Sequence, residues 1–295
     1  MRFGIMAMQT GMLIPPPAAL KDPMAFIMGF DHAGLVRQIS SQGFNLIELG
    51  GDMVLFFPQA FSPANVQKLA ELKKEQGLTY TMHLPLWSVE PSTLLQPVRL
   101  GSQRALVEAV QATQALGIED YVLHATGALA AEFTQMRLPD AGKALILRQF
   151  QANARATIHA LLSETGLPSR KLAVETIEFP FELMMELATE ADTSICLDVG
   201  HVLAGFSGPI QLFDALEAVL PRLGEIHLHD SPWQGLDRKI AYGKDHQALG
   251  KGDLDVGRLL DTLAEAKWNG PIIFELSGEE ARQSLEVIHR LRPSV

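Results

Sequence analysis

Seven short apolar segments of this chain each end in an acidic side chain or a histidine, and both kinds of side chain can bind a metal ion. The terminal residues are Glu48, His83, His124, Glu175, Asp198, His229 and Glu275. Stretches with a helical spacing of apolar residues separate these segments. In an α/β barrel, the loops that follow the strands all converge on one rim, at the carboxyl ends of the strands. The pattern therefore predicts a barrel in which these polar groups gather at that rim.

Strand then helix, repeated along the chain, predicts a single α/β domain, a (β/α)8 TIM barrel with parallel strands, over residues 1–295. No linker or low-complexity segment divides the chain. The expected strands are short and apolar, as strands buried on both faces are. They span about 2–7, 45–49, 79–84, 120–125, 171–176, 194–199, 225–230 and 271–276. Helices are expected over about 63–76, 102–116, 141–164, 181–191, 210–220, 254–267 and 279–291.

Strand alternation indicates which side chains face the inside of the barrel, because residues i and i+2 share a face. Glu175, Asp198, His227 and Glu275 each alternate with apolar neighbours that suit the surrounding helix layer. A carboxylate buried at such a depth is costly to ionise without a cation beside it. Three acids and a histidine converging there predict a divalent metal ion.

Further polar residues at the strand ends and in one loop could bind a metal, contact a substrate or pack as hydrogen-bonded core groups. The candidates for a further metal or for substrate are His83, His124, His201 and His246. Glu48 could support the substrate or a ligand histidine. His229 could hydrogen-bond to a metal ligand or contact the substrate.

Composition narrows the class of partner. The formal charge of −10 argues against a general nucleic-acid-binding surface, which is usually basic, although bound divalent ions would offset part of that charge. The single Cys196 cannot form an internal disulfide and fits a reducing compartment. No apolar run reaches the length of a membrane span. We expect a cytoplasmic protein that acts on a small molecule without a membrane or nucleic acid, and an oligomer of identical chains is compatible with the sequence.

Four segments resemble the xylose-isomerase-like TIM-barrel superfamily, which joins sugar and sugar-phosphate isomerases and epimerases to endonuclease IV (AP endonuclease family 2). They are CLDVGH (196–201), IHLHD (226–230), HQALGKGDLD (246–255) and NGPIIFE (269–275), and the resemblance covers nearly the whole chain. In the isomerase–epimerase branch it implies one metal ion held by Glu175, Asp198, His227 and Glu275. Manganese or zinc is the preferred expectation, and magnesium or cobalt is also compatible with mixed carboxylate and imidazole ligands.

That branch implies isomerisation or epimerisation of a sugar or sugar phosphate, which is the preferred prediction. The metal would chelate a carbonyl and the adjacent hydroxyl and so acidify the neighbouring C–H bond. Glu175 and Glu275 would remove and return the proton. The expected substrate contacts are Glu48, His229, Trp233 and Lys244, with Lys244 near a substrate phosphate. Epimerases related to tagatose epimerase have an arginine a few residues after the seventh-strand histidine, a region that reads Ser231-Pro232-Trp233 in this chain, where Trp233 offers an aromatic surface instead.

The endonuclease IV branch implies a multi-zinc hydrolase built on the same residues. Such a cluster activates a water molecule and clamps a phosphodiester. By resemblance, His83, His124 and Glu175 would hold a first zinc, the four residues named above a second, and His201 and His246 would help to bind a third. The chain departs from this pattern at Lys244, where the endonuclease has an aspartate, although Asp245 could compensate.

Two segments resemble the cobamide-remodelling hydrolases of the superfamily, TYTMHLPL (79–86) and AVETIEFPFE (173–182). The alternative prediction is therefore hydrolysis of a small-molecule phosphodiester such as a cobamide. Abasic DNA ranks below it, because basic loops that would clasp DNA are not evident.

Overall fold

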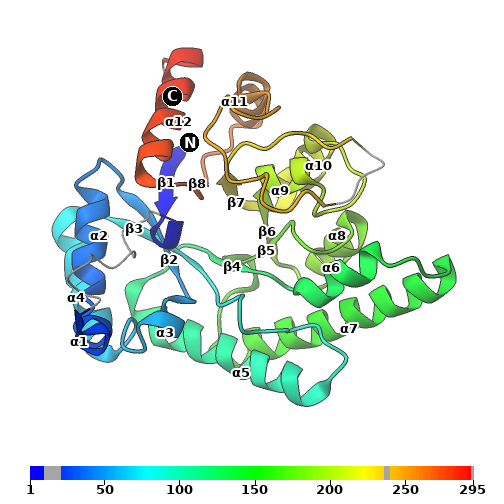
Figure 1. The fold of residues 1–295 in the computed structure, drawn as a ribbon, viewed down its shortest axis with the longest axis horizontal. Coiled ribbons are helices and arrows are strands. Elements are labelled where there is room, and N and C mark those ends of the chain that lie inside the picture. Colours follow the sequence, from blue (N-terminus) through cyan, green and yellow to red (C-terminus); the bar gives the residue numbers. More distant parts are fainter. Residues whose placement is uncertain (10–20, 236–239, 294–295) are drawn as a thin grey trace.

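The computed structural model describes residues 1–9, 21–235 and 240–293. Eight parallel strands form a closed barrel in which each strand pairs with the next and β1 pairs with β8, as expected (Figure 1). The strands are β1 (Arg2–Met6), β2 (Leu46–Gly50), β3 (Thr79–His83), β4 (Tyr121–Leu123), β5 (Leu172–Glu175), β6 (Ser194–Asp198), β7 (Leu223–Leu228) and β8 (Pro271–Phe274).

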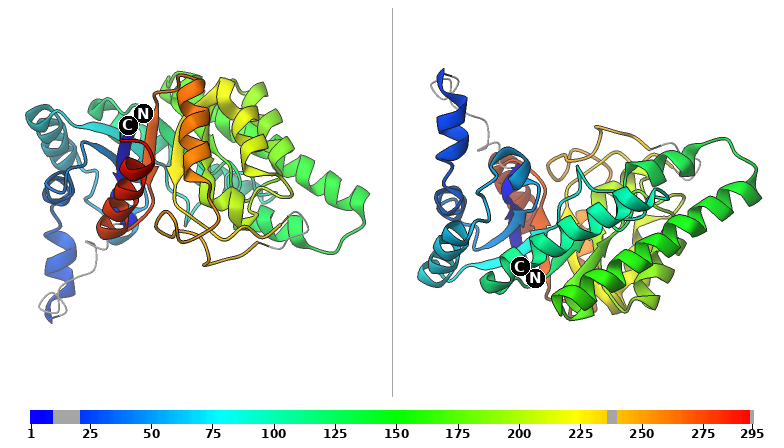
Figure 2. Two further views of the ribbon diagram at one scale, coloured as in Figure 1. Left: turned by 90° about the horizontal axis from the view of Figure 1, so that it is seen from above. Right: turned by 90° about the horizontal axis from the view of Figure 1, so that it is seen from below.

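Helices surround the barrel, and the long pair α5 and α7 packs along one side of it (Figures 1 and 2). The helices are α1 (Pro23–Met28), α2 (His32–Ser40), α3 (Met53–Phe56), α4 (Pro63–Gln76), α5 (Gln96–Thr113), α6 (Ala128–Gln135), α7 (Asp140–Thr165), α8 (Phe181–Glu190), α9 (Val199–Ala204), α10 (Leu212–Val219), α11 (Val256–Glu265) and α12 (Gly278–Leu291). Short 3-10 turns occupy η1 (Ala7–Gln9), η3 (Gln114–Leu116), η4 (Ser169–Lys171) and η5 (Leu220–Arg222). In the described residues, no helix is long and apolar enough to span a membrane.

Local sequence explains where several helices begin and end. The Ser62 hydroxyl accepts the backbone N–H of Asn65 at the start of α4, and Gly77 ends that helix in the left-handed region at φ 67°. Helix α5 begins at Gln96, six residues before the expected start at 102. Pro97 in its first turn is compatible with a helix start, because the amide hydrogen that proline lacks has no partner there.

Alternation along the strands divides inward from outward side chains. Leu197, Ile226 and Leu228 belong to the large apolar core shared with the helices. On the inside, Val122, Ala173 and Cys196 form a separate small apolar cluster. Polar side chains above this cluster are thus held in a barrel whose wall is apolar and closely packed. The strand ends differ from expectation by up to two residues, and His124, His229 and Glu275 lie one residue beyond their strands.

Candidate metal centre

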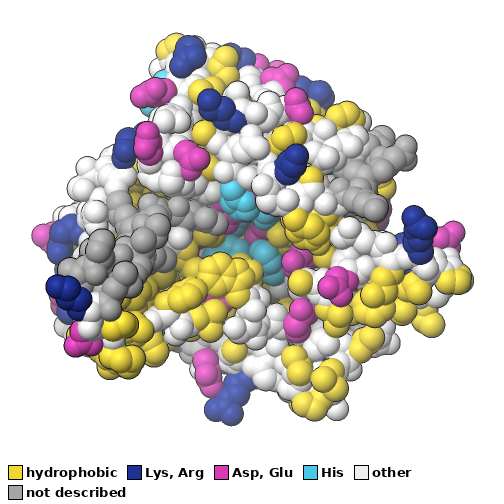
Figure 3. Space-filling model, viewed as in Figure 1, with side chains coloured by type: hydrophobic (Ala, Val, Ile, Leu, Met, Phe, Trp, Pro, Cys, Tyr) yellow, Lys and Arg dark blue, Asp and Glu magenta, His cyan; other side chains and the backbone are white. Residues whose placement is uncertain are grey.

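A cavity of about 360 Å³ opens at the carboxyl ends of the strands. Histidines lie at the bottom of this hollow, and hydrophobic side chains flank them (Figure 3). Six of the predicted site residues line the cavity: His83, His124, Glu175, His201, His246 and Glu275. The other predicted ligands, Asp198 and His227, lie just beneath and are fully buried. The barrel therefore brings together all eight residues that were expected to bind a metal or the reacting part of a substrate.

Glu175, at the end of β5, is the carboxylate around which the first group gathers. Its Oε2 lies 3.2 Å from His83 Nε2 and 3.0 Å from His124 Nε2. Its Oε1 lies 3.3 Å from His201 Nδ1. Ligand atoms about 2.0–2.1 Å from one tetrahedral ion are separated by about 3.3 Å. His83, His124 and Glu175 thus have the spacing of ligands to a single ion, and one ligand atom from each lies within 4.8 Å of the others.

His227 stands at the centre of a second group. Its Nδ1 lies 3.3 Å from Glu275 Oε1, 3.6 Å from Glu175 Oε2 and 3.8 Å from Asp198 Oδ2. Neither ring nitrogen of His227 has a hydrogen-bond partner among the described residues, although the side chain is fully buried. Buried polar atoms normally have partners. A divalent cation bound among these carboxylates would supply the partner that Nδ1 lacks, so the residues present fit a metal ion.

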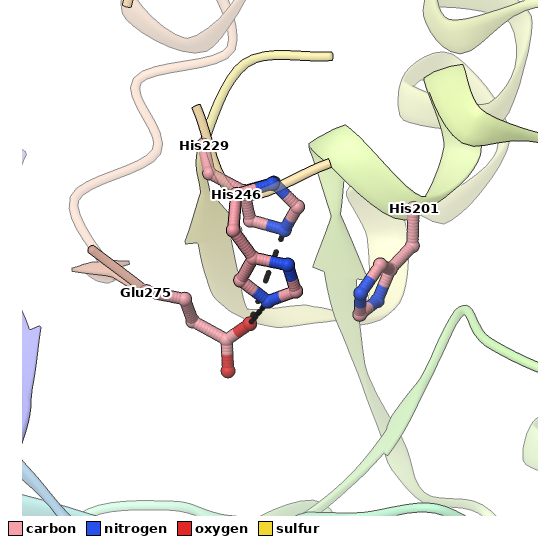
Figure 4. Close-up of side chains that lie close together, drawn as sticks. All are labelled: His201, His229, His246 and Glu275. Carbon is pink, nitrogen blue, oxygen red and sulfur yellow. Dashed lines mark hydrogen bonds and ion pairs between the residues drawn. The ribbon is translucent and has the colours of Figure 1, made fainter. Parts of the chain in front are cut away.

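A third group consists of His201, His229, His246 and Glu275 (Figure 4), and it shares His201 with the first group and Glu275 with the second. His246 Nε2 lies 3.1 Å from Glu275 Oε2, and the rings of His229 and His246 stack with centroids 4.1 Å apart. His246 adopts φ 56°, in the left-handed region that a non-glycine residue rarely occupies. Such a conformation costs roughly 1 kcal/mol or more and persists where the surroundings enforce it.

His229 connects two of these groups. Its Nδ1 accepts the backbone N–H of His246 at 2.8 Å, and its Nε2 contacts the Asp198 carboxylate at 3.1 Å. With both nitrogens engaged, His229 orients Asp198 and the loop that carries His246. Gly200 permits this arrangement, because a Cβ there would lie 2.0 Å from His229 Nδ1.

Asp198 and Asp230 position the polypeptide around the site. Asp198 is the N-cap of α9 and accepts the backbone N–H of His201 at 2.6 Å, which fixes the spacing of two candidate ligands. Asp230, one residue beyond His229, accepts the backbone N–H groups of Gly250 and Leu254 at 2.8 and 3.0 Å. These bonds hold the loop that begins with His246 against the end of β7.

Charge in the cavity is balanced between carboxylates and imidazoles. Burial opposes the charge on Glu175, but His124 and His227 hold the pKa of this carboxyl well below its usual range. Burial likewise opposes a charged His124, yet Glu175 and Glu178 raise the pKa of this imidazole to about 10. Asp245 and Glu275 raise the pKa of His246 to about 10 against the same opposition. Ionised acids facing imidazoles that hold protons form a set of ligands in which divalent ions can replace the protons.

Glu48 and Glu225 lie beneath His227, fully buried inside the barrel. Glu48 Oε2 is 3.3 Å from His227 Nε2, and Glu225 Oε1 is 4.0 Å from the same nitrogen. The Thr81 hydroxyl donates to Glu225 at 3.1 Å. Burial and then the charge of Glu48 raise the pKa of Glu225 well above its usual value. Glu48 therefore lies where a carboxylate would orient the ring of His227 from the side away from the cavity.

Two expected substrate contacts lie elsewhere. Trp233 lines a different cavity with Phe213 and Asp255, and its backbone N–H donates to Asp253 Oδ2 at 2.8 Å. Lys244 is exposed and is not among the described residues that line the metal cavity. Its neighbour Asp245 points inward, with Oδ2 3.3 Å from both His201 Nε2 and His246 Nδ1.

Sequence reasoning missed three features of the site. Glu225 shares the alternation of His227 and could have been identified from the segment LGEIHLHD (223–230). Glu178, which lies in the left-handed region at φ 59°, lines the cavity beside His124. Trp87 also lines the cavity, but it lies in a loop after β3 where no periodicity marks it.

Fold and site together define a (β/α)8 barrel with a carboxylate–histidine centre of the kind that binds divalent metals. The chain belongs to the family described as xylose isomerase-like TIM barrel, whose model matches residues 36–291. It is 24% identical over 238 residues to a probable endonuclease 4 of Mycobacterium leprae (strain Br4923), a match that covers 79% of this chain and 88% of that protein.

Solved structures of two kinds share the fold. One is a D-tagatose 3-epimerase-like protein, with a TM-score of 0.69 and 17% identity over 99% of this chain and 97% of that chain. Another is endonuclease IV from Thermus thermophilus, with a TM-score of 0.67 and 20% identity over the whole of both chains. The fold is therefore shared with both branches of the superfamily, and the choice between their reactions depends on the site.

Proposed function

We propose that this protein is a multinuclear metal-dependent hydrolase that acts on the phosphodiester of a small molecule. The supporting observation is the position of His83 and His124, which both lie against Glu175 Oε2 in the same cavity as the other candidate ligands. A one-metal isomerase needs neither histidine as a ligand. Zinc suits the group of His83, His124 and Glu175, because two imidazoles and a carboxylate are typical zinc ligands. This geometry moves the hydrolase ahead of the isomerase that the sequence favours.

Bound divalent ions in such a cluster would acidify a water molecule and neutralise the phosphoryl oxygens. The residues of this chain would do the rest. Glu175 and Glu275 hold the ligand histidines at fixed separations across the cavity. Asp198 and His229 fix the direction of α9 and of the His246 loop. The apolar barrel wall keeps this charged set rigid and poorly hydrated, which strengthens its electrostatic effect on a reacting phosphate.

Isomerisation or epimerisation of a sugar or sugar phosphate is the second candidate. It is favoured by the presence of two glutamates, Glu175 and Glu275, in one cavity with His227 within 3.6 Å of both. In that reaction one metal ion bound by Glu175, Asp198, His227 and Glu275 would suffice, and the glutamates would exchange a proton with the substrate.

His83→Ala distinguishes the two reactions. The zinc-loaded parent is expected to hydrolyse bis(4-nitrophenyl) phosphate, and His83→Ala should reduce kcat at least 100-fold through loss of a metal ligand. His159→Ala, on the exposed face of α7, is the matched control and should keep the parental rate. Two results together would favour the isomerase over the hydrolase. The parent would hydrolyse no phosphodiester, and both the parent and His83→Ala would exchange the α-proton of an open-chain sugar in heavy water.

A further inference from the structure

The mouth of the metal cavity is lined by exposed aromatic side chains. Trp87 is 60% exposed and Tyr242 is 62% exposed, and both line the cavity that holds the candidate ligands. Phe56, 47% exposed, packs edge to face against Trp87 with ring centroids 5.8 Å apart. Hydrophobic side chains flank the histidine hollow on two sides (Figure 3). Large apolar side chains gathered around a cleft commonly mark a ligand-binding surface.

These aromatic side chains are continuous with the metal centre. Tyr242 packs edge to face on Phe206 at 5.4 Å, and Phe206 lies 4.8 Å from the ring of His201. On the other side, Asp52, itself 2% exposed, accepts the backbone N–H groups of Leu86 and Trp87 at 2.8 and 3.3 Å. The loop that carries Trp87, which follows β3, is thus fixed against the segment that follows β2. A ring system lying between Trp87 and Tyr242 would reach toward the candidate ligands at the bottom of the cavity.

The charged side chains that line the cavity indicate which kind of substrate group its mouth can bind. Among the described residues that line the cavity, the charged ones other than histidines are acidic, namely Asp52, Glu175, Glu178 and Glu275. No Lys or Arg side chain is among these described lining residues. Bound metal ions would balance the charge of the inner carboxylates. A long polyanion would also need cationic side chains at the mouth, whereas the described residues there are aromatic. Aromatic side chains bind flat rings by stacking.

We propose that the mouth of the cavity is a subsite for a flat apolar ring of the substrate, bound between Trp87 and the Phe206–Tyr242 pair. The substrate is then a small phosphodiester with an aromatic or other planar group next to the scissile phosphate. This inference rests on the proposed hydrolase function, since that function supplies the phosphate. Trp87 and Tyr242 determine specificity through binding and take no part in bond breaking.

Unreactive phosphonates test the subsite separately from hydrolysis. Binding of methylphosphonate and of 2-naphthylmethylphosphonate to the zinc-loaded protein is measured by isothermal titration calorimetry. The parent should bind the naphthyl compound roughly tenfold more tightly, since stacking on one aromatic side chain contributes about 1–3 kcal/mol. Trp87→Ala and Tyr242→Ala should each remove most of this preference and leave the Kd of methylphosphonate unchanged. Trp87→Phe should restore most of it.

Trp233→Ala is the matched control, because Trp233 lines another cavity, and it should keep the full preference. The subsite would be refuted if the parent shows no preference for the naphthyl compound, or if both alanine variants keep the parent's preference. Failure of the parent to bind either phosphonate would also refute it. Ring preference without any hydrolysis of phosphodiesters would refute the hydrolase and leave the subsite intact. Hydrolysis without ring preference would refute the subsite alone.

Discussion

Asp245 and Lys244 are neighbours in sequence that face opposite ways, and this contrast gives a sharp test of the third ligand group. Asp245 Oδ2 contacts His201 Nε2 and His246 Nδ1, both at 3.3 Å, and its side chain is 9% exposed. Lys244 is exposed. We predict that Asp245→Ala weakens metal binding and hydrolysis, whereas Lys244→Ala has little effect on either.

The size of the effect follows from the two contacts. A hydrogen bond to a charged group contributes roughly 1.5–3 kcal/mol, so two additive contacts at the lower figure would contribute about 3 kcal/mol. Contacts that share one carboxylate are not additive, and about 2 kcal/mol is the expected loss. That energy corresponds to roughly a 30-fold decrease in metal affinity or in kcat/KM.

The assay titrates zinc into the chelated protein against a competing indicator and measures kcat/KM on bis(4-nitrophenyl) phosphate in the same samples. Asp245→Asn is the conservative variant, which keeps the size of the side chain and removes its charge, and it should fall between the parent and Asp245→Ala. Equal effects of the alanine variants at 244 and 245, or parental zinc affinity in Asp245→Ala, would refute the role assigned to this carboxylate.

Three further perturbations have defined outcomes. Glu275→Gln should reduce turnover at least 100-fold with an unchanged circular dichroism spectrum, and full activity would refute its role. Glu48→Gln should lower metal affinity roughly 10- to 100-fold in chelator competition, because the ring of His227 loses the carboxylate that orients it; unchanged affinity would contradict this. Burial lowers the pKa of His32 to about 4 from 6.5, so its contribution to stability is present above pH 6.5 and is lost as the pH falls toward 4. Between pH 7 and pH 4, the free energy of unfolding measured in urea should fall by roughly 3 kcal/mol less in His32→Gln than in the parent. An equal decrease in both proteins would refute the effect assigned to His32.

Local sequence predicts the barrel and its candidate ligand residues because both depend on short-range rules. A buried parallel strand is a short apolar run, and a polar side chain at its carboxyl end has few places to point except the rim. For this reason Glu175, Asp198 and His227 are recognisable from the sequence alone. The start of α5 at Gln96 was missed, although Pro97 is a local signal of it.

The rest of the site depends on contacts between distant segments. Trp233 was expected at the substrate, but its backbone bond to Asp253 fixes it beside the segment that precedes α11. Trp87 lies at the cavity instead, because Asp52, from the loop after a different strand, holds its backbone. The inward direction of Asp245 likewise depends on its contact with His201, which lies in α9. No periodicity in the sequence encodes such packing between loops.

The number of metal ions bound per chain tests the proposed function most directly. Elemental mass spectrometry of the purified protein, prepared without chelators, gives the amount of each metal relative to protein concentration. A multinuclear hydrolase built on the three ligand groups should contain two or three ions per chain, predominantly zinc. About one ion per chain, particularly manganese, would contradict it and favour the isomerase or epimerase.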